Sequence, residues 1–148
     1  MKLEEVLKQE KFDNIHEKLA LNFIYTANRI ESKINCLLKG SNLSSQQYNV
    51  LRILKGQYPT PVTLLQIKER MLDKESNVSR LVEKLFQAGL INRKQCPNDR
   101  RQLDIILTHK GHELLDYLNP KVKDEIEKQF NITKEKAGQL NDMIDNIR

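Results

Sequence analysis

The sequence predicts a mainly α fold with a small β component (α+β) in one domain. Apolar residues recur at steps of three and four along most of the chain, which is the spacing of one helix face. Glycine and proline are sparse, with 5 and 4 copies among 148 residues. Residues 90–107 depart from this spacing and predict a β-hairpin. A chain of this length supports one well-buried core and is too short for two ordinary domains.

The first segment predicts one long helix, because apolar residues keep the helical spacing from Phe12 to Leu37. Asn14 followed by Glu17 fits a capping box at its start, and Gly40 is expected to end it. A helix of about 25 residues is roughly 37 Å long, which is more than the core of such a small domain needs. We therefore expect part of this helix to pack against another molecule.

Three shorter helices are predicted in the centre of the chain. Ser44 and Gln47 form a capping box for the first of them. Prolines in residues 57–62 then interrupt the pattern, and a second helix follows over residues 63–72. The apolar residues of this second helix are expected to reach the core: Leu64, Leu65, Ile67, Met71 and Leu72.

The third of these helices is predicted over residues 75–88, with Asp73 as its cap and Gly89 after its end. Val78, Leu81, Val82 and Leu85 form its apolar stripe. The opposite face is polar and basic. Two short helices joined by a tight turn, the second with such a face, form a helix-turn-helix candidate. The residues of the polar face are Ser76, Asn77, Arg80, Glu83, Lys84 and Gln87.

The hairpin is predicted from residues 90–96 and 103–107, with residues 97–101 as the connection. Thr108 is expected to cap a long helix that Pro120 either kinks or divides at Asn119. Thr133 is expected to cap the last helix. The chain is thus expected to be a single domain, 1–148, with a central lobe over residues 41–108 between terminal helices in residues 1–40 and 109–148.

Positive charge is concentrated in the middle of the chain, within a net charge of +5. Residues 76–101 contain six basic and two acidic side chains, whereas residues 112–148 contain six basic and eight acidic ones. The hairpin tip, "CPNDRRQ", holds two arginines beside Asp99. Three helices followed by a hairpin with a basic tip are the arrangement of a winged helix-turn-helix. Phosphates attract such a tip, and an arginine on a narrow loop can enter a minor groove.

Residues 76–111, "SNVSRLVEKLFQAGLINRKQCPNDRRQLDIILTHKG", resemble the MarR family of bacterial transcription regulators. The "AGLI" that ends the helix, the Asp-Arg-Arg wing and the "LTHKG" that follows carry the resemblance, and "LSSQQYNVLRIL" is similar to the family's second helix. The resemblance implies a winged helix-turn-helix with long N- and C-terminal dimerisation helices. It also implies a homodimer that binds double-stranded DNA at a pseudo-palindromic operator.

The resemblance assigns expected roles to particular residues. Arg101 is expected to enter the minor groove, with Asp99 as the ion-pair partner that orients it. Where many relatives have proline or threonine early in the recognition helix, this chain has Glu75 and Asn77, so the operator sequence stays open. Ser76 and Asn77 can alternatively act only as helix caps, and the basic residues can be an ordinary solvated helix face. The expected DNA-binding residues are Ser76, Asn77, Ser79, Arg80, Lys84, Lys94, Asp99, Arg100 and Arg101.

A small-molecule effector is the third implied partner, in the crevice between the dimer helices and the DNA-binding lobe. Its expected lining is Phe23, Tyr25, Tyr48 and Leu51, which can instead be plain core. The predicted function is therefore a sequence-specific DNA-binding transcriptional regulator, a homodimeric repressor that an effector releases from DNA.

Several alternatives stay open. Cys96 or Cys36 can make the protein a redox-sensing regulator. His109 and His112, with Glu113 and Asp116 nearby, can contribute metal ligands, although no metal or other cofactor is expected. The basic surface can also belong to an interaction module for RNA or an acidic protein. No motif of a hydrolase or transferase is found, so an enzyme is not expected. Without an apolar span or an export signal, we expect no membrane partner and a cytoplasmic location.

Overall fold

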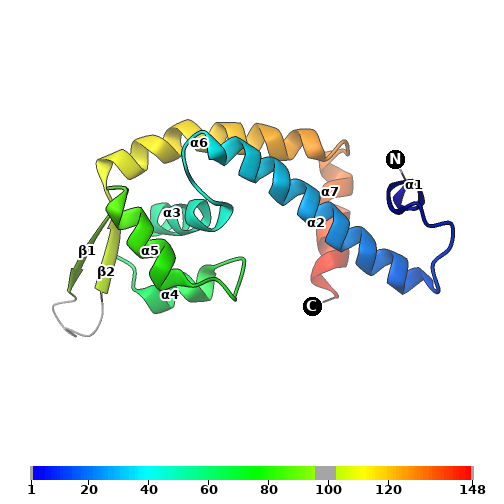
Figure 1. The fold of residues 1–148 in the computed structure, drawn as a ribbon, viewed down its shortest axis with the longest axis horizontal. Helices are drawn as coiled ribbons and strands as arrows, with labels where there is room; N and C mark the ends of the chain where they lie inside the picture. The colour runs from blue at the N-terminus through cyan, green and yellow to red at the C-terminus, as the bar shows by residue number, and fades with distance from the viewer. Residues whose placement is uncertain (1, 96–102, 148) are drawn as a thin grey trace.

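The computed structural model describes residues 2–95 and 103–147. These residues form mainly helices and one antiparallel two-stranded sheet, as the sequence predicts (Figure 1). The elements in chain order are α1 (Leu3–Leu7), α2 (Ile15–Lys39), α3 (Ser45–Gln57), α4 (Leu64–Arg70), α5 (Val78–Gln87), β1 (Ile91–Gln95), β2 (Leu103–Leu107), α6 (His109–Gln129) and α7 (Lys134–Asp145).

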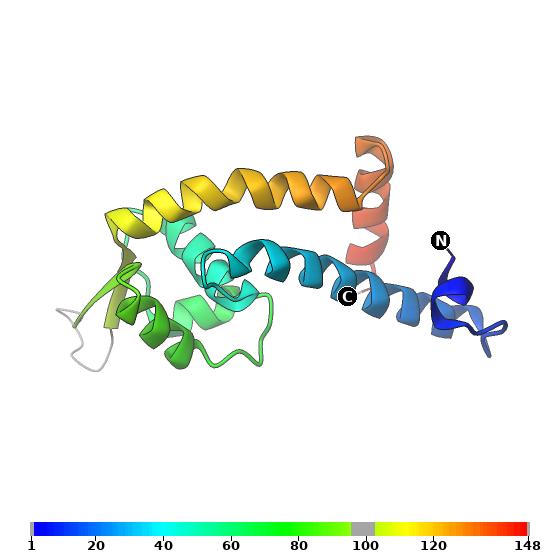
Figure 2. The ribbon, with the colours of Figure 1, turned by 45° about the horizontal axis from the view of Figure 1, so that its top comes forward.

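A lobe at one end of the molecule contains α3, α4, α5 and the hairpin (Figures 1 and 2). Helices α2 and α6 leave this lobe side by side, and α7 follows the far end of α6 and runs crosswise to it. The first residue of α2 is therefore far from the lobe, whereas its last turn packs into it.

The hydrophobic core is located in the lobe, where α3, α4, α5 and both strands supply most of its buried side chains. Helix α2 adds the fully buried Leu38 from its last turn, and α6 adds the buried Leu115, Leu118 and Val122. No residue of α7 is buried. None of the helices in the described ranges is both long and apolar enough to cross a membrane.

Four helix caps expected from the sequence are confirmed. Ser44 and Gln47 bond reciprocally, with the Gln47 N–H donating to Ser44 Oγ at 3.2 Å and the Ser44 N–H donating to Gln47 Oε1 at 2.9 Å. Asn14, Thr108 and Thr133 each accept a backbone N–H from the first turn of their helices, at 2.9, 3.1 and 3.3 Å. These local signals position the helix starts because each satisfies a donor that the helix leaves free.

The second central helix is shorter than predicted, since α4 ends at Arg70. Leu65 and Leu72 were expected in the core, and this is wrong: they are 67% and 89% exposed. A helix of seven residues has only one buried face, on which Ile67 lies. Met71 is buried just after the helix, and the next backbone N–H, of Leu72, donates to Asn49 Oδ1 at 3.0 Å.

Helix α6 passes through Pro120 without interruption, so of the two alternatives expected there, a kink or a division at Asn119, the division is wrong. Proline removes one backbone donor. The buried Leu118 and Val122 on either side of it keep both halves of the helix packed on the same core.

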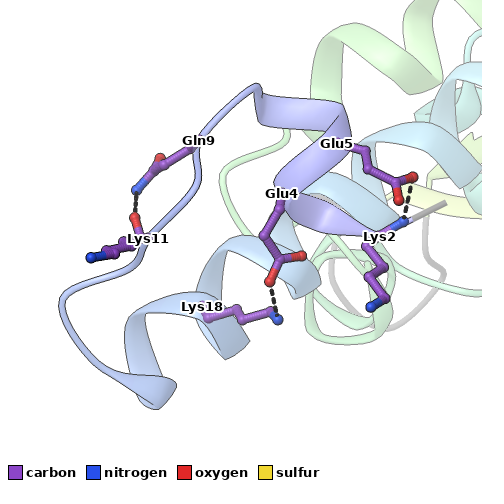
Figure 3. Close-up of polar contacts among 6 residues, drawn as sticks. All are labelled: Lys2, Glu4, Glu5, Gln9, Lys11 and Lys18. Atoms are coloured by element: carbon purple, nitrogen blue, oxygen red, sulfur yellow. Dashed lines mark hydrogen bonds and ion pairs between the residues drawn. The ribbon is translucent and has the colours of Figure 1, made fainter.

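Helix α1 was not predicted, because five residues are too short for a periodic signal. Its Leu3 is buried, and Glu4 Oε1 lies 2.5 Å from Lys18 Nζ on α2 (Figure 3). This hydrogen bond to Lys18 lowers the pKa of Glu4. The Lys2 N–H also donates to Glu5 Oε2 at 3.1 Å. The N-terminal segment is thereby attached to the outer half of α2.

Candidate nucleic-acid interface

Helix α5 separates apolar and polar residues onto opposite faces. Val78, Val82 and Leu85 are buried against the lobe, as their spacing predicts. The side chains that point away from the lobe are exposed, and they include Ser79, Arg80 and Lys84. The core thus fixes which face of this helix is presented to solvent.

The start of α5 differs from the prediction. The helix begins at Val78, and its cap is Asn77, whose Oδ1 accepts the Arg80 N–H at 3.0 Å. Asp73, the expected cap, instead closes a turn ahead of the helix. Its two carboxylate oxygens accept the Glu75 N–H at 3.0 Å and the Ser76 Oγ–H at 2.9 Å. Because the carboxylate of Asp73 is engaged in this turn, Asn77 is the residue that accepts a free backbone N–H from the first turn of α5.

Two shallow depressions flank the start of α5, with Ser76 and Asn77 in the lining of both. One, of about 320 Å³, extends along Arg80 and Lys84 and reaches Gln46 on α3. The other, of about 540 Å³, extends to Lys68 on α4. Gln46 and Lys68 were not among the residues expected from the sequence, because helices distant in sequence from α5 contribute them. Lys68 is exposed on α4, whereas Gln46 is half-buried on α3.

The hairpin extends from the lobe beside α5 (Figure 1). Strand β1 pairs antiparallel with β2 from Ile91 opposite Leu107 to Gln95 opposite Leu103. Val62, from the segment before α4, exchanges two backbone hydrogen bonds of 2.9 Å with Ile105. This single antiparallel bridge joins the segment to β2. The exposed Lys94 lies on β1. The remaining predicted wing residues, Asp99, Arg100 and Arg101, lie outside the described residues.

The four expected effector-lining residues do not share one cavity. Tyr25 lines a depression of about 160 Å³ beside α1, and Tyr48 lines one of about 400 Å³ between α3 and α6. Tyr48 Oη donates to Asn119 Oδ1 at 2.7 Å, and burial raises the pKa of its phenol. Phe23 is 37% exposed on α2. Leu51 is corrected to a core residue, since none of its surface is exposed.

A larger, mostly apolar groove of about 570 Å³ lies between α2 and the lobe. Ala27, Ile30 and Ile34 of α2 form one wall. The segment that leads into α5, with Leu72 and Asp73, forms part of the other. This crevice has the location that the sequence analysis expected for an effector, with a different lining.

The residues considered for redox or metal chemistry do not form a site within the described ranges. Cys36 is an exposed free thiol on α2, and Cys96 lies outside the described residues. His109 Nε2 lies 3.3 Å from Glu113 Oε1 on the surface of α6. The His112 ring instead packs edge-on against Tyr58, with 4.5 Å between ring centroids.

A helix pair, an exposed polar face on its second helix and an adjoining hairpin define a winged helix-turn-helix protein. Residues 43–103 match the model of the MarR family. Over 113 residues the chain is 30% identical to the HTH-type transcriptional regulator MhqR of Bacillus subtilis, covering 75% of each chain. The chain belongs to the MarR family.

Two further comparisons describe its relatives. The chain is 29% identical to the transcriptional repressor MprA of Escherichia coli over 58% of its own length, and this match spans about half (49%) of the MprA sequence. The fold is similar to that of Sco3205, a MarR family transcriptional regulator from Streptomyces coelicolor solved in complex with DNA. That comparison has a TM-score of 0.81 at 22% identity and covers 93% of this chain and 88% of Sco3205.

Proposed function

We propose that this protein is a sequence-specific DNA-binding regulator that acts as a homodimeric repressor. The observation that carries the proposal is the exposed polar face of α5, which includes the basic Arg80 and Lys84. Asn77 caps this helix, and the hairpin beside it bears the exposed Lys94. Neither the packing of the lobe nor its solubility requires this arrangement. The DNA complex of Sco3205 and the repressor MprA support the same function in relatives. A protein that binds bacterial DNA works in the cytoplasm.

In this proposal Ser76, Asn77, Ser79, Arg80 and Lys84 lie at the major groove, and the hairpin reaches the neighbouring minor groove. Gln46 and Lys68 join them at the edges of the two depressions. Polar residues near the start of a helix approach the edges of the DNA bases most closely. The basic side chains contact phosphates and set the register of the protein on the duplex.

The dimer is proposed from the apolar surface that the lobe leaves uncovered. On α2, Ile15 and Leu19 are 72% and 45% exposed, and on α7, Leu140 and Met143 are 40% and 64% exposed. Burial of such faces against a second copy explains why helices in residues 1–40 and 109–148 extend beyond the core. A two-fold dimer would place two recognition helices at half-sites about 10 bp apart.

Selection of binding sites from a random duplex library tests the proposal. A regulator should enrich a pseudo-palindrome and bind it at least about 10³-fold more tightly than random duplex. Footprinting on the DNA upstream of its own gene should protect the same motif. Binding to all duplexes with equal affinity, or preference for RNA, would contradict a sequence-specific DNA regulator.

We propose the 570 Å³ groove between α2 and the lobe as the effector site. An effector there would favour one spacing of α2 and the lobe, and it can shift DNA affinity only by its differential affinity for the two states. Compounds that raise the melting temperature and weaken operator binding are expected to lose both effects in Ala27→Trp, which fills the groove. A response that persists in this variant would place the effector elsewhere.

A further inference from the structure

Three side chains interlock where α5 meets β1. Arg93 Nη1, on β1, donates to Glu83 Oε2, on α5, at 2.5 Å. The same guanidinium lies over the ring of Phe86, with 4.1 Å from Arg93 Cζ to the ring centroid. Gln87 Nε2 donates to the other oxygen of Glu83, Oε1, at 3.0 Å. Both carboxylate oxygens of Glu83 are therefore engaged, and α5 holds Arg93 by an ion pair and by ring contact.

These contacts join α5 and β1 at a point further along the chain than the turn that connects them. The chain leaves α5 at Gly89, whose φ of +71° favours glycine, and the Leu90 N–H donates to the Leu85 carbonyl at 3.0 Å. Arg93 lies in the middle of β1, opposite Ile105. A bond from this position back to α5 resists rotation of the hairpin arm about the turn.

The position of Glu83 makes its charge unexpected. It follows Arg80 by three residues, and this spacing makes the two side chains neighbours on the surface of α5. A carboxylate there repels phosphates as the helix approaches DNA. The side chains of Glu83 and Arg93 are 43% and 31% exposed, and ion pairs with such exposure add little to stability. Neither DNA attraction nor folding stability accounts for an acid at this position.

We infer that Glu83 is a positioning residue for DNA recognition: by holding Arg93, it sets the direction of the hairpin relative to α5. The inference rests on the DNA-binding function proposed above. A planar guanidinium suits the task because it bonds the carboxylate along one edge while its face rests on the Phe86 ring. The recognition helix and the hairpin then reach one DNA site in a fixed relative orientation, and less entropy is lost on binding.

Two roles of Glu83, repulsion of DNA by its charge and positioning of the hairpin, predict opposite changes in operator affinity for Glu83→Gln. If Glu83 acts only through its charge, removal of the charge strengthens binding to every duplex. If it positions the hairpin, specific affinity falls roughly five-fold, as expected for loss of one directional contact, while affinity for random duplex stays level or rises. Glu75→Gln is the matched control, because Glu75 lines a depression at the start of α5 and forms no ion pair within the described residues. It should bind both duplexes at least as tightly as wild type.

Arg93 supplies a second arm of the experiment. Arg93→Lys keeps the charge but loses the planar group, so it should lower specific affinity as Glu83→Gln does. The double variant should bind the operator no more weakly than either single variant does, because both substitutions break the same contact between Glu83 and Arg93. Melting temperatures of all variants show whether each is folded. A loss of stability alone would lower specific and random affinity together, so the ratio of the two affinities reports positioning.

The outcomes separate the inference from the function on which it rests. A wild-type protein with no sequence preference overturns the proposed function and this inference with it. A wild-type preference, together with Glu83→Gln that binds its operator as tightly as Glu75→Gln does, overturns the inference alone. A drop in the ratio for Glu83→Gln and Arg93→Lys, non-additive in the double variant, establishes it.

Discussion

Substitution of Gly111 by alanine should destabilise the protein, although alanine is the better helix former. Gly111 lies in the first turn of α6 and is buried. A Cβ at this position would lie 2.2 Å from the carbonyl oxygen of Leu90 and 3.1 Å from Cδ2 of Leu107. The Leu90 carbonyl also accepts the Thr108 N–H at 3.1 Å. The start of α6 and the base of the hairpin are therefore in direct backbone contact.

The magnitude follows from two opposing effects. Replacement of glycine by alanine within a helix stabilises by up to about 1 kcal/mol. The new methyl group, however, meets backbone rather than a flexible side chain, so α6 and the hairpin must separate. Overpacking of this kind costs about 1–3 kcal/mol, and the hydrogen bond of Thr108 is strained as well. We expect a net loss of about 2 kcal/mol, which lowers the melting temperature by roughly 6 °C in a chain of this size.

Thermal and urea unfolding of Gly111→Ala measure this effect, with Gly138→Ala as the control. Gly138 lies inside α7, and no described atom outside its own helical surroundings lies within 4 Å of the position of its Cβ. This control should be stabilised by about 0.5–1 kcal/mol. If Gly111→Ala is as stable as wild type or more stable, the close approach of α6 to Leu90 is refuted.

Three further predictions concern the interface and the lobe. Asn77→Ala should lose about 1 kcal/mol of stability and Asn77→Ser little, because serine keeps the cap, so reduced operator affinity in Asn77→Ser would reveal a DNA contact beyond capping. Arg80→Ala and Lys84→Ala should each lower the slope of log affinity against log salt by about 1, and an unchanged slope would remove that residue from the phosphate contacts. The hydrogen bond from Lys55 lowers the pKa of Asp116, so the ion pair stabilises the fold above the ordinary carboxyl pKa and this contribution disappears as the pH falls through the lowered value. Melting temperatures of wild type and Asp116→Asn should therefore converge in acid, and a constant difference would contradict this cause.

Local signals account for the parts of the fold that the sequence predicted. A cap such as Ser44 or Thr108 acts within its own first turn, and the stripe of Val78, Val82 and Leu85 follows from 3.6 residues per turn. Where two local solutions compete, sequence reasoning was less exact. Asp73 and Asn77 are both good caps, and the turn formed by Asp73 moved the start of α5 to Val78.

The candidate site was predictable in part for the same reason. The polar face of α5 is a property of one helix, so Arg80 and Lys84 could be selected from their spacing. Gln46 and Lys68 could not, because their place beside Ser76 depends on the angles between α3, α4 and α5. The groove proposed as the effector site depends in the same way on how far α2 lies from the lobe.

By itself, the sequence determined that long helices and a hairpin form, which face of α5 is apolar, and where basic charge is concentrated. Each of these properties is settled within a few turns of chain. Only the tertiary structure decided that Arg93 reaches Glu83, that Gly111 meets the backbone of Leu90, and that Leu72 remains exposed. Such contacts depend on the packing of elements far apart in sequence, whose separations and angles are fixed by the shape of the whole core.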